Sequence, residues 1–177
     1  MKRFRELIYN LHPYLLSCIS GPLTVAQIVL ALVFSQPGSE AIRWIGYTLW
    51  WAGAVLGWLP IFILRSKGNV PRGKGYVHTT TLVETGLYAI VRHPQMGSAW
   101  MLMCLSLMLI TQHWSSAALG IPAMILVYLD LLKADQRCIE KFGAAYRQYM
   151  HRVPRVNFVA GLIRLLARRA APKVEIV

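Results

Sequence analysis

Long apolar stretches dominate the pattern of this chain. No Asp, Glu, Lys or Arg occurs in residues 7–39, 44–64 or 94–129. A helix that crosses a bilayer needs about 20 apolar residues, because the hydrocarbon core is about 30 Å thick and a helix rises about 1.5 Å per residue. The first two stretches therefore predict one membrane span each, over residues 13–34 and 44–64.

The third stretch is too long for a single span. As one helix it would measure about 54 Å, nearly twice the thickness of the hydrocarbon core. We therefore expect it to fold back near residues 111–114 and to form two short spans, 97–110 and 115–132. The pattern predicts one all-α membrane domain over residues 1–177, a helical bundle with about four transmembrane helices that include a helical hairpin.

The chain after the fourth span is predicted to be helical and extramembrane. Residues 133–150 are expected to leave the bilayer as a helix, on which Cys138, Phe142, Tyr146 and Tyr149 form one stripe. Such a stripe usually packs in a core, but its tyrosines would also place hydroxyl groups beside a polar ligand. In residues 158–170, leucines and arginines would lie on different faces of a helix, which predicts an amphipathic helix on the membrane surface.

The charges show how the spans are oriented. The chain has 19 Lys and Arg against 7 Asp and Glu, a net charge of +12, although only 15% of its residues are charged. All of the Lys and Arg except Arg43 lie before the first span, between the second and third, or after the fourth. Because positive loops stay cytoplasmic, both termini are predicted to face the cytoplasm, at a bacterial inner membrane or an ER-type membrane. The basic charge thus indicates topology and contact with anionic lipid rather than nucleic acid, since no basic and aromatic recognition motif accompanies it.

Common catalytic and metal-binding patterns are missing from the sequence. The five histidines show no spacing of three or four residues, and the three cysteines lie far apart, so we expect neither a metal site nor a disulfide framework. No glycine-rich nucleotide motif follows a predicted strand, so we expect no Rossmann domain. Any cofactor would have to bind a different kind of fold.

Two places at the membrane surface carry candidate chemistry. Pro94 suits the first turn of a helix, which would put Arg92 and His93 beside a helix N-terminus that favours an anion. The alternative is a basic turn in which Arg92 only extends toward lipid headgroups. Asp130 is costly near the end of a span unless it lines a cavity or pairs with Lys133 or Arg137.

Two sequence blocks resemble a known family. They are Leu-Val-Glu-Thr-Gly-Leu-Tyr at 82–88 with Arg-His-Pro at 92–94, and Phe-Gly-Ala-Ala-Tyr-Arg-Gln-Tyr at 142–149 with Arg-Val-Pro at 152–154. In this order around a hydrophobic hairpin, they resemble the isoprenylcysteine carboxyl methyltransferases, whose wider group includes phospholipid N-methyltransferases. The resemblance covers residues 79–154.

The resemblance implies an integral membrane methyltransferase that uses S-adenosylmethionine and acts on a lipophilic small molecule, a lipid or a prenylated acceptor. It implies extramembrane cofactor-binding parts at 65–96 and 133–158, and the expected catalytic residues are Arg92, His93 and Asp130. We expect Arg92 and His93 to bind the cofactor carboxylate, Asp135 or Asp130 to bind its hydroxyls or ammonium, and Tyr88 and Tyr146 to pack around it. The cofactor-binding residues are expected to be Thr80, Thr81, Leu82, Val83, Tyr88, His93, Pro94, Gln95, Met96, Asp135 and Tyr146.

The sequence departs from the family pattern at several positions. Thr80 replaces a histidine, Met96 a tyrosine, and Ala134 with Asp135 a pair of glutamates. Asp130 stands where the family has a substrate-binding arginine, and an aspartate would repel a substrate carboxylate rather than bind it. If the acceptor is an amine, Asp130 would hold its cation or take its proton.

Two other function classes stay open on the sequence. Sterol reductases share the C-terminal pattern, which would make the protein a nicotinamide-dependent reductase, but this chain is much shorter than those enzymes. A non-enzymatic membrane scaffold is the other alternative, because the departures remove residues on which the family's chemistry depends.

Overall fold

All regular secondary structure in the described part of the protein is helical. The structure is a computed structural model, and it describes residues 2–12, 15–33 and 37–170. Within these residues there are helices and no strands. The helices are α1 (Lys2–Asn10), α2 (Leu15–Val33), α3 (Glu40–Lys67), η1 (Gly86–Ala89), η2 (Pro94–Ala99), α4 (Trp100–Thr111), α5 (Trp114–Arg152) and α6 (Phe158–Ala170).

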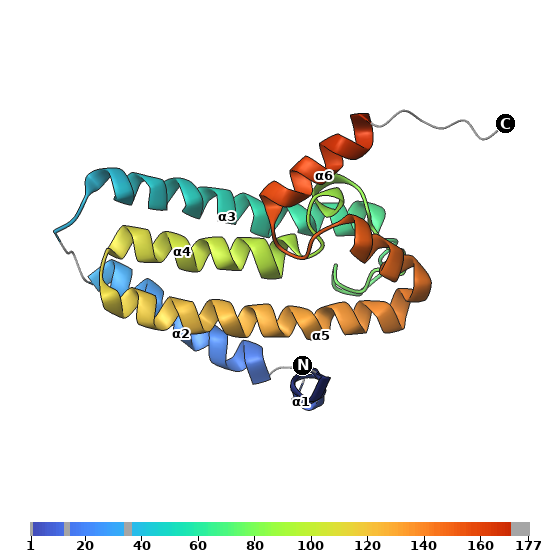
Figure 1. Ribbon diagram of the computed structural model, residues 1–177, viewed down its shortest axis with the longest axis horizontal. Coiled ribbons are helices and arrows are strands. Elements are labelled where there is room, and N and C mark those ends of the chain that lie inside the picture. The colour runs from blue at the N-terminus through green and yellow to red at the C-terminus, as the bar shows by residue number, and fades with distance from the viewer. Residues whose placement is uncertain (1, 13–14, 34–36, 171–177) are drawn as a thin grey trace.

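Four of these segments are long and apolar enough to cross a membrane. They are Leu15–Val33, Glu40–Lys67, Pro94–Thr111 and Trp114–Arg152. Helices α3, α4 and α5 lie side by side, with α4 in the middle, and α2 packs against α5 (Figure 1). The predicted fold class, an all-α bundle of about four such helices, is confirmed. Residues 13, 14 and 34 of the first predicted span, and Lys173 of the topology prediction, lie outside the described residues.

Helix α3 has small buried residues where it contacts its neighbours and large exposed apolar residues elsewhere. Gly46, Gly53 and Pro60 are buried in the contact with its neighbours, whereas Trp44, Trp51 and Trp58 are each about two-thirds exposed. Large exposed apolar side chains in a continuous band are costly in water and suit hydrocarbon. The small inward residues allow α3 to approach α4 closely. Helices in a membrane gain stability from such close packing.

The hairpin lies where the sequence predicts a turn. Helix α4 ends at Thr111, Gln112 takes a left-handed conformation with φ of 49°, and α5 begins at Trp114. At the other end of α4, Pro94 occupies the first turn of η2, a wide π-helical segment that runs directly into α4. Arg92 and His93 therefore immediately precede this helical segment.

The end of α5 differs from the predicted straight helix. Gly143 has φ of 58° and ψ of −128°, a conformation that is essentially restricted to glycine, and the chain turns back there (Figure 1). The expected single stripe from Cys138 to Tyr149 is therefore wrong in its geometry. The stripe is divided between two helical segments, which brings its tyrosines back toward the middle of α5.

Helix α6 lies across the loop that precedes η2. Gly161 touches the backbone of Ile90 so closely that a Cβ atom at this position would overlap the Ile90 carbonyl oxygen. Leu162, Ile163 and Leu166 of α6 are exposed, and Arg164, Arg168 and Arg169 lie on the same helix. This amphipathic helix occupies the predicted range, 158–170.

Candidate functional site

A large cavity opens at the end of the bundle that carries the loops. It has a volume of about 610 Å³, within the range of cofactor and small-molecule sites. The loop between α3 and η2 forms one wall, and α5 with its reversed end forms the other. Its lining residues are Ser17, Leu64, Tyr76, Val77, His78, Thr79, Thr81, Leu82, Val83, Tyr88, Arg92, His93, Pro94, Gln95, Met96, Asp130, Ala134, Arg137, Cys138, Lys141, Phe142, Tyr146 and Tyr149.

Most residues that the sequence singled out lie together in this lining. Of the predicted cofactor-binding and catalytic residues, Thr80 and Asp135 are the two that do not line the cavity. The hydroxyl of Thr80 faces away and donates to the carbonyl of Asn69 at 2.8 Å. Asp135 is buried behind the cavity wall, with 3% of its surface exposed.

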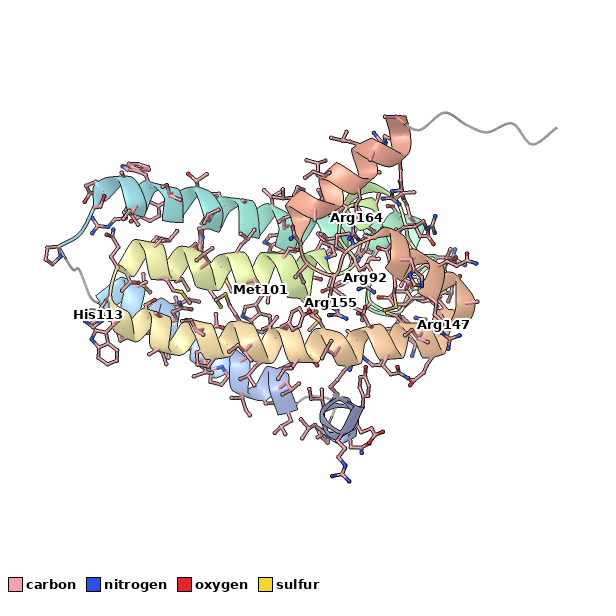
Figure 2. The ribbon with its side chains drawn as sticks, viewed as in Figure 1. Arg92, Met101, His113, Arg147, Arg155 and Arg164 are labelled. Carbon is pink, nitrogen blue, oxygen red and sulfur yellow. The ribbon has the colours of Figure 1, made fainter. Side chains whose placement is uncertain are left out.

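Asp135 connects the separate parts of the site. His93 Nε2 lies 2.8 Å from its Oδ1, and the Tyr146 hydroxyl donates to the same oxygen at 2.7 Å. Arg155 Nε donates to Oδ2 at 2.7 Å, and Arg92 Nη1 lies 3.3 Å from Oδ1. Figure 2 shows Arg92 and Arg155 at the same end of the bundle, far from the His113 turn. Asp135 therefore holds the lining residues in place, instead of facing a ligand as expected.

The segment after α5 completes this arrangement. The backbone N–H groups of Arg92 and His93 donate to the carbonyls of Pro154 and Arg155 at 3.0 and 3.1 Å. The hydroxyl of Tyr149 donates to the carbonyl of Tyr88 at 2.6 Å. These bonds fix both walls against each other. Sequence reasoning missed Arg155, because a single arginine in a basic tail gives no signal of a distant carboxylate partner.

Arg92 is incompletely paired. It is 8% exposed, and its Nε and Nη1 atoms make no hydrogen bond with any described residue, although Nη1 is within ion-pair distance of Asp135. A buried guanidinium with unused donors is costly unless an acceptor reaches it. An anionic group, such as a carboxylate, matches this need.

Asp130 lines the cavity and is the first residue along α5 to do so. The hydroxyl of Ser17 on α2 donates to Asp130 Oδ2 at 2.8 Å, while Oδ1 makes no hydrogen bond with any described residue. Pairing with Lys133 or Arg137 was the expected alternative. Instead, Lys133 Nζ donates to the carbonyls of Leu11 and His12, at 2.7 and 3.0 Å, and ties α5 to the end of α1.

Tyr88 and Arg155, which lie outside the four membrane-length helices, have shifted pKa values. Burial raises the pKa of the Tyr88 hydroxyl well above its usual value, and the nearby Tyr76 adds to this effect. Tyr88 is therefore a neutral phenol at physiological pH. Burial alone would lower the pKa of Arg155, but its hydrogen bond to Asp135 and the charge of that residue raise it overall. Arg155 is therefore a permanent cation.

A second cavity adjoins the first within the apolar part of the bundle. Its volume is about 500 Å³, and it lies between α3 and the η2–α4 segment. Gln95 lines both cavities, and its Oε1 accepts a hydrogen bond from the Tyr76 hydroxyl at 3.0 Å. We call this second cavity the apolar groove; it is lined by Trp50, Gly53, Ala54, Gly57, Trp58, Ile61, Gln95, Ala99, Trp100 and Met103.

Among the described residues, no group of three His, Cys, Asp or Glu side chains is placed to hold a metal ion. No family model, curated protein or solved structure matches this chain.

Proposed function

We propose that the protein is an integral membrane methyltransferase that uses S-adenosylmethionine to methylate a lipophilic acceptor. One observation carries the proposal: a cavity of about 610 Å³, at the end of four membrane-length helices, is lined by nearly all the residues that the family resemblance selected. Those residues come from two segments that are far apart in the sequence, and the cavity is where the two segments meet.

The chemistry of the lining fits this cofactor. The unused donors of Arg92 suit the carboxylate of an amino acid group. Tyr88, Phe142 and Tyr149 offer aromatic faces to an adenine ring, and Val83 and Leu82 supply apolar wall.

The residues of the chain would act by positioning and by excluding water. When bound, the cofactor supplies a methyl group activated by a sulfonium, which an acceptor lone pair takes as the carbon–sulfur bond breaks. Such a displacement needs alignment and a dry site more than a strong acid or base. Asp135 would keep Arg92 and His93 in the geometry that receives the ligand, and Tyr146 would close the wall behind them.

The apolar groove supports a lipophilic acceptor. Its lining is apolar except for Gln95, a residue that also lines the main cavity. An acyl or isoprenoid chain in the groove would place its polar end near the cavity without leaving the apolar phase. By the distribution of positive charge, the cavity end of the bundle would face the cytoplasm, with both termini on the same side.

Calorimetric titration of the purified protein with S-adenosylhomocysteine tests the proposal. We expect binding of the wild type and at least tenfold weaker binding of Arg92→Gln. Arg147→Gln changes an exposed arginine outside the cavity lining and should leave the affinity unchanged. Tight binding of NADPH without S-adenosylhomocysteine binding would point to a reductase instead, and binding of neither would overturn the proposal in favour of a scaffold.

A further inference from the structure

The lining of the main cavity includes a carboxylate, Asp130, with one oxygen that makes no hydrogen bond in the described structure. Asp130 is 4% exposed, and its Oδ1 is buried without a hydrogen bond in the described structure. A carboxylate buried in this way is costly, because its charge and its lone pairs need a partner. Ser17 supplies one donor and no charge, so most of this need is unmet.

The position of Asp130 separates it from the residues proposed to bind the cofactor. Along α5 it precedes Phe142 by twelve residues, or about 18 Å of helix, and it lies within the predicted fourth span. Its neighbour Ser17 comes from α2, another membrane-length helix. A molecule that reaches the cavity from the bilayer therefore meets Asp130 from the membrane side.

From this geometry we infer that the methyl acceptor is a lipophilic amine, whose N–H group donates to Asp130 Oδ1. The inference rests on the proposed function, because it names the substrate class of the same site. An ammonium supplies both the proton donor and the opposite charge that Asp130 lacks. Transfer of that proton to Asp130 Oδ1 frees the nitrogen lone pair, which then takes the methyl group as the carbon–sulfur bond breaks. A carboxylic acid acceptor would bring a second negative charge to a buried carboxylate, and an alcohol would leave the charge of Asp130 uncompensated.

Ser17 is a positioning residue in this scheme. Its hydroxyl donates to Oδ2 at 2.8 Å, which holds one oxygen of the carboxylate and leaves Oδ1 without a hydrogen bond in the described structure. Removing the hydroxyl would leave the charge of Asp130 in place and loosen its orientation. The effect of Ser17→Ala on amine binding should therefore be smaller than that of Asp130→Asn.

The test compares octylamine with octanoate on protein reconstituted in phosphatidylcholine nanodiscs, with empty nanodiscs subtracted. The two probes share an alkyl chain, so the ratio of their affinities reports the head group. We expect the wild type to prefer octylamine at least tenfold, as for a hydrogen bond to a charged group. Asp130→Asn should abolish the preference, and Ser17→Ala should reduce it.

Glu140→Gln is the matched control, because it makes the same carboxylate-to-amide change on an exposed part of α5 outside the cavity lining. It should leave the preference intact. A wild type without preference, or a preference that Asp130→Asn retains, would overturn the inference. It would also be overturned if Asp130→Asn weakened S-adenosylhomocysteine binding and not the octylamine preference, since Asp130 would then serve the cofactor.

The same titrations separate the two proposals. If the wild type binds no S-adenosylhomocysteine but shows an octylamine preference that depends on Asp130, the proposed function fails and the amine site stands. If S-adenosylhomocysteine binds and the preference is absent, the amine inference fails alone.

Discussion

The hydroxyl of Tyr146 lies 2.7 Å from Oδ1 of Asp135, although eleven residues separate them along what the sequence predicts as one helix. In a straight helix this separation would be about 16 Å. The chain reversal at Gly143 brings the two residues together, so that residues of the predicted helical stripe line a cavity.

Loss of the Asp135 charge should strongly destabilise the fold. In Asp135→Asn, Arg92, Arg155 and His93 lose the carboxylate that they share. Breaking a buried ion pair typically costs about 3–5 kcal/mol, because the remaining charges stay buried without compensation. We expect a loss of this order in the free energy of unfolding, measured by denaturation in mixed detergent micelles.

The control is Glu84→Gln, which removes a carboxylate from an ion pair that is half exposed at Arg152. Solvent screens this pair, so its loss should cost less than about 1 kcal/mol. Equal effects of the two substitutions would contradict the central role assigned to Asp135.

Alanine at Gly143 should also destabilise the protein. The φ of 58° and ψ of −128° at this position strain any residue with a side chain, by about 1–3 kcal/mol. Gly21→Ala is the matched control, because Gly21 lies inside α2 with open space around its Cα, where alanine should be neutral or slightly stabilising. Thermal unfolding of the two variants should shift in opposite directions, or only Gly143→Ala should shift.

Tyr149→Phe should weaken the junction between the two cavity walls. The substitution removes the hydroxyl that donates to the Tyr88 carbonyl at 2.6 Å, at a cost of about 1 kcal/mol. Hydrogen exchange around Tyr88 should become faster while the membrane helices keep their protection. Tyr47→Phe, at an exposed position on α3, should change neither quantity, and faster exchange throughout the protein would argue against a local junction.

A larger residue at Gly57 should close the apolar groove. A Cβ at this position would meet only Ala99, at 3.8 Å, so Gly57→Leu fits without backbone strain and extends into the groove. A lipid with a photoreactive acyl chain should label Trp100 and Met103 in the wild type and several-fold less in Gly57→Leu. Gly21→Leu controls for added bulk in a membrane helix, and unchanged labelling in Gly57→Leu would show that the groove holds no lipid chain.

The helices could be predicted from the sequence because bilayer thickness fixes the length of an apolar run. The turn near Gln112 could also be predicted, because the third apolar stretch, as one helix, is longer than the hydrocarbon core is thick. The Gly143 reversal was not, because one glycine within a helical pattern is usually tolerated in place. A local pattern also could not separate Asp135, which is buried behind the wall, from Asp130, which lines the cavity five residues earlier.

The contact of Asp130 with Ser17 and that of Asp135 with Arg155 depend on the paths of distant segments. Periodicity describes one helix at a time, so it cannot predict partners on another. The resemblance supplied the lining residues of the two blocks, but no signal in the sequence identified Arg155.

The bonds from Arg92 and His93 to the carbonyls of Pro154 and Arg155 have a consequence for biosynthesis. A ribosome makes residues 92 and 93 some sixty residues before their partners, roughly the time needed to insert the last two membrane helices. The cavity walls can lock together only after that insertion. In a nascent chain the cavity therefore has only one of its walls. The complete cavity forms only in a bundle whose helices have already been inserted.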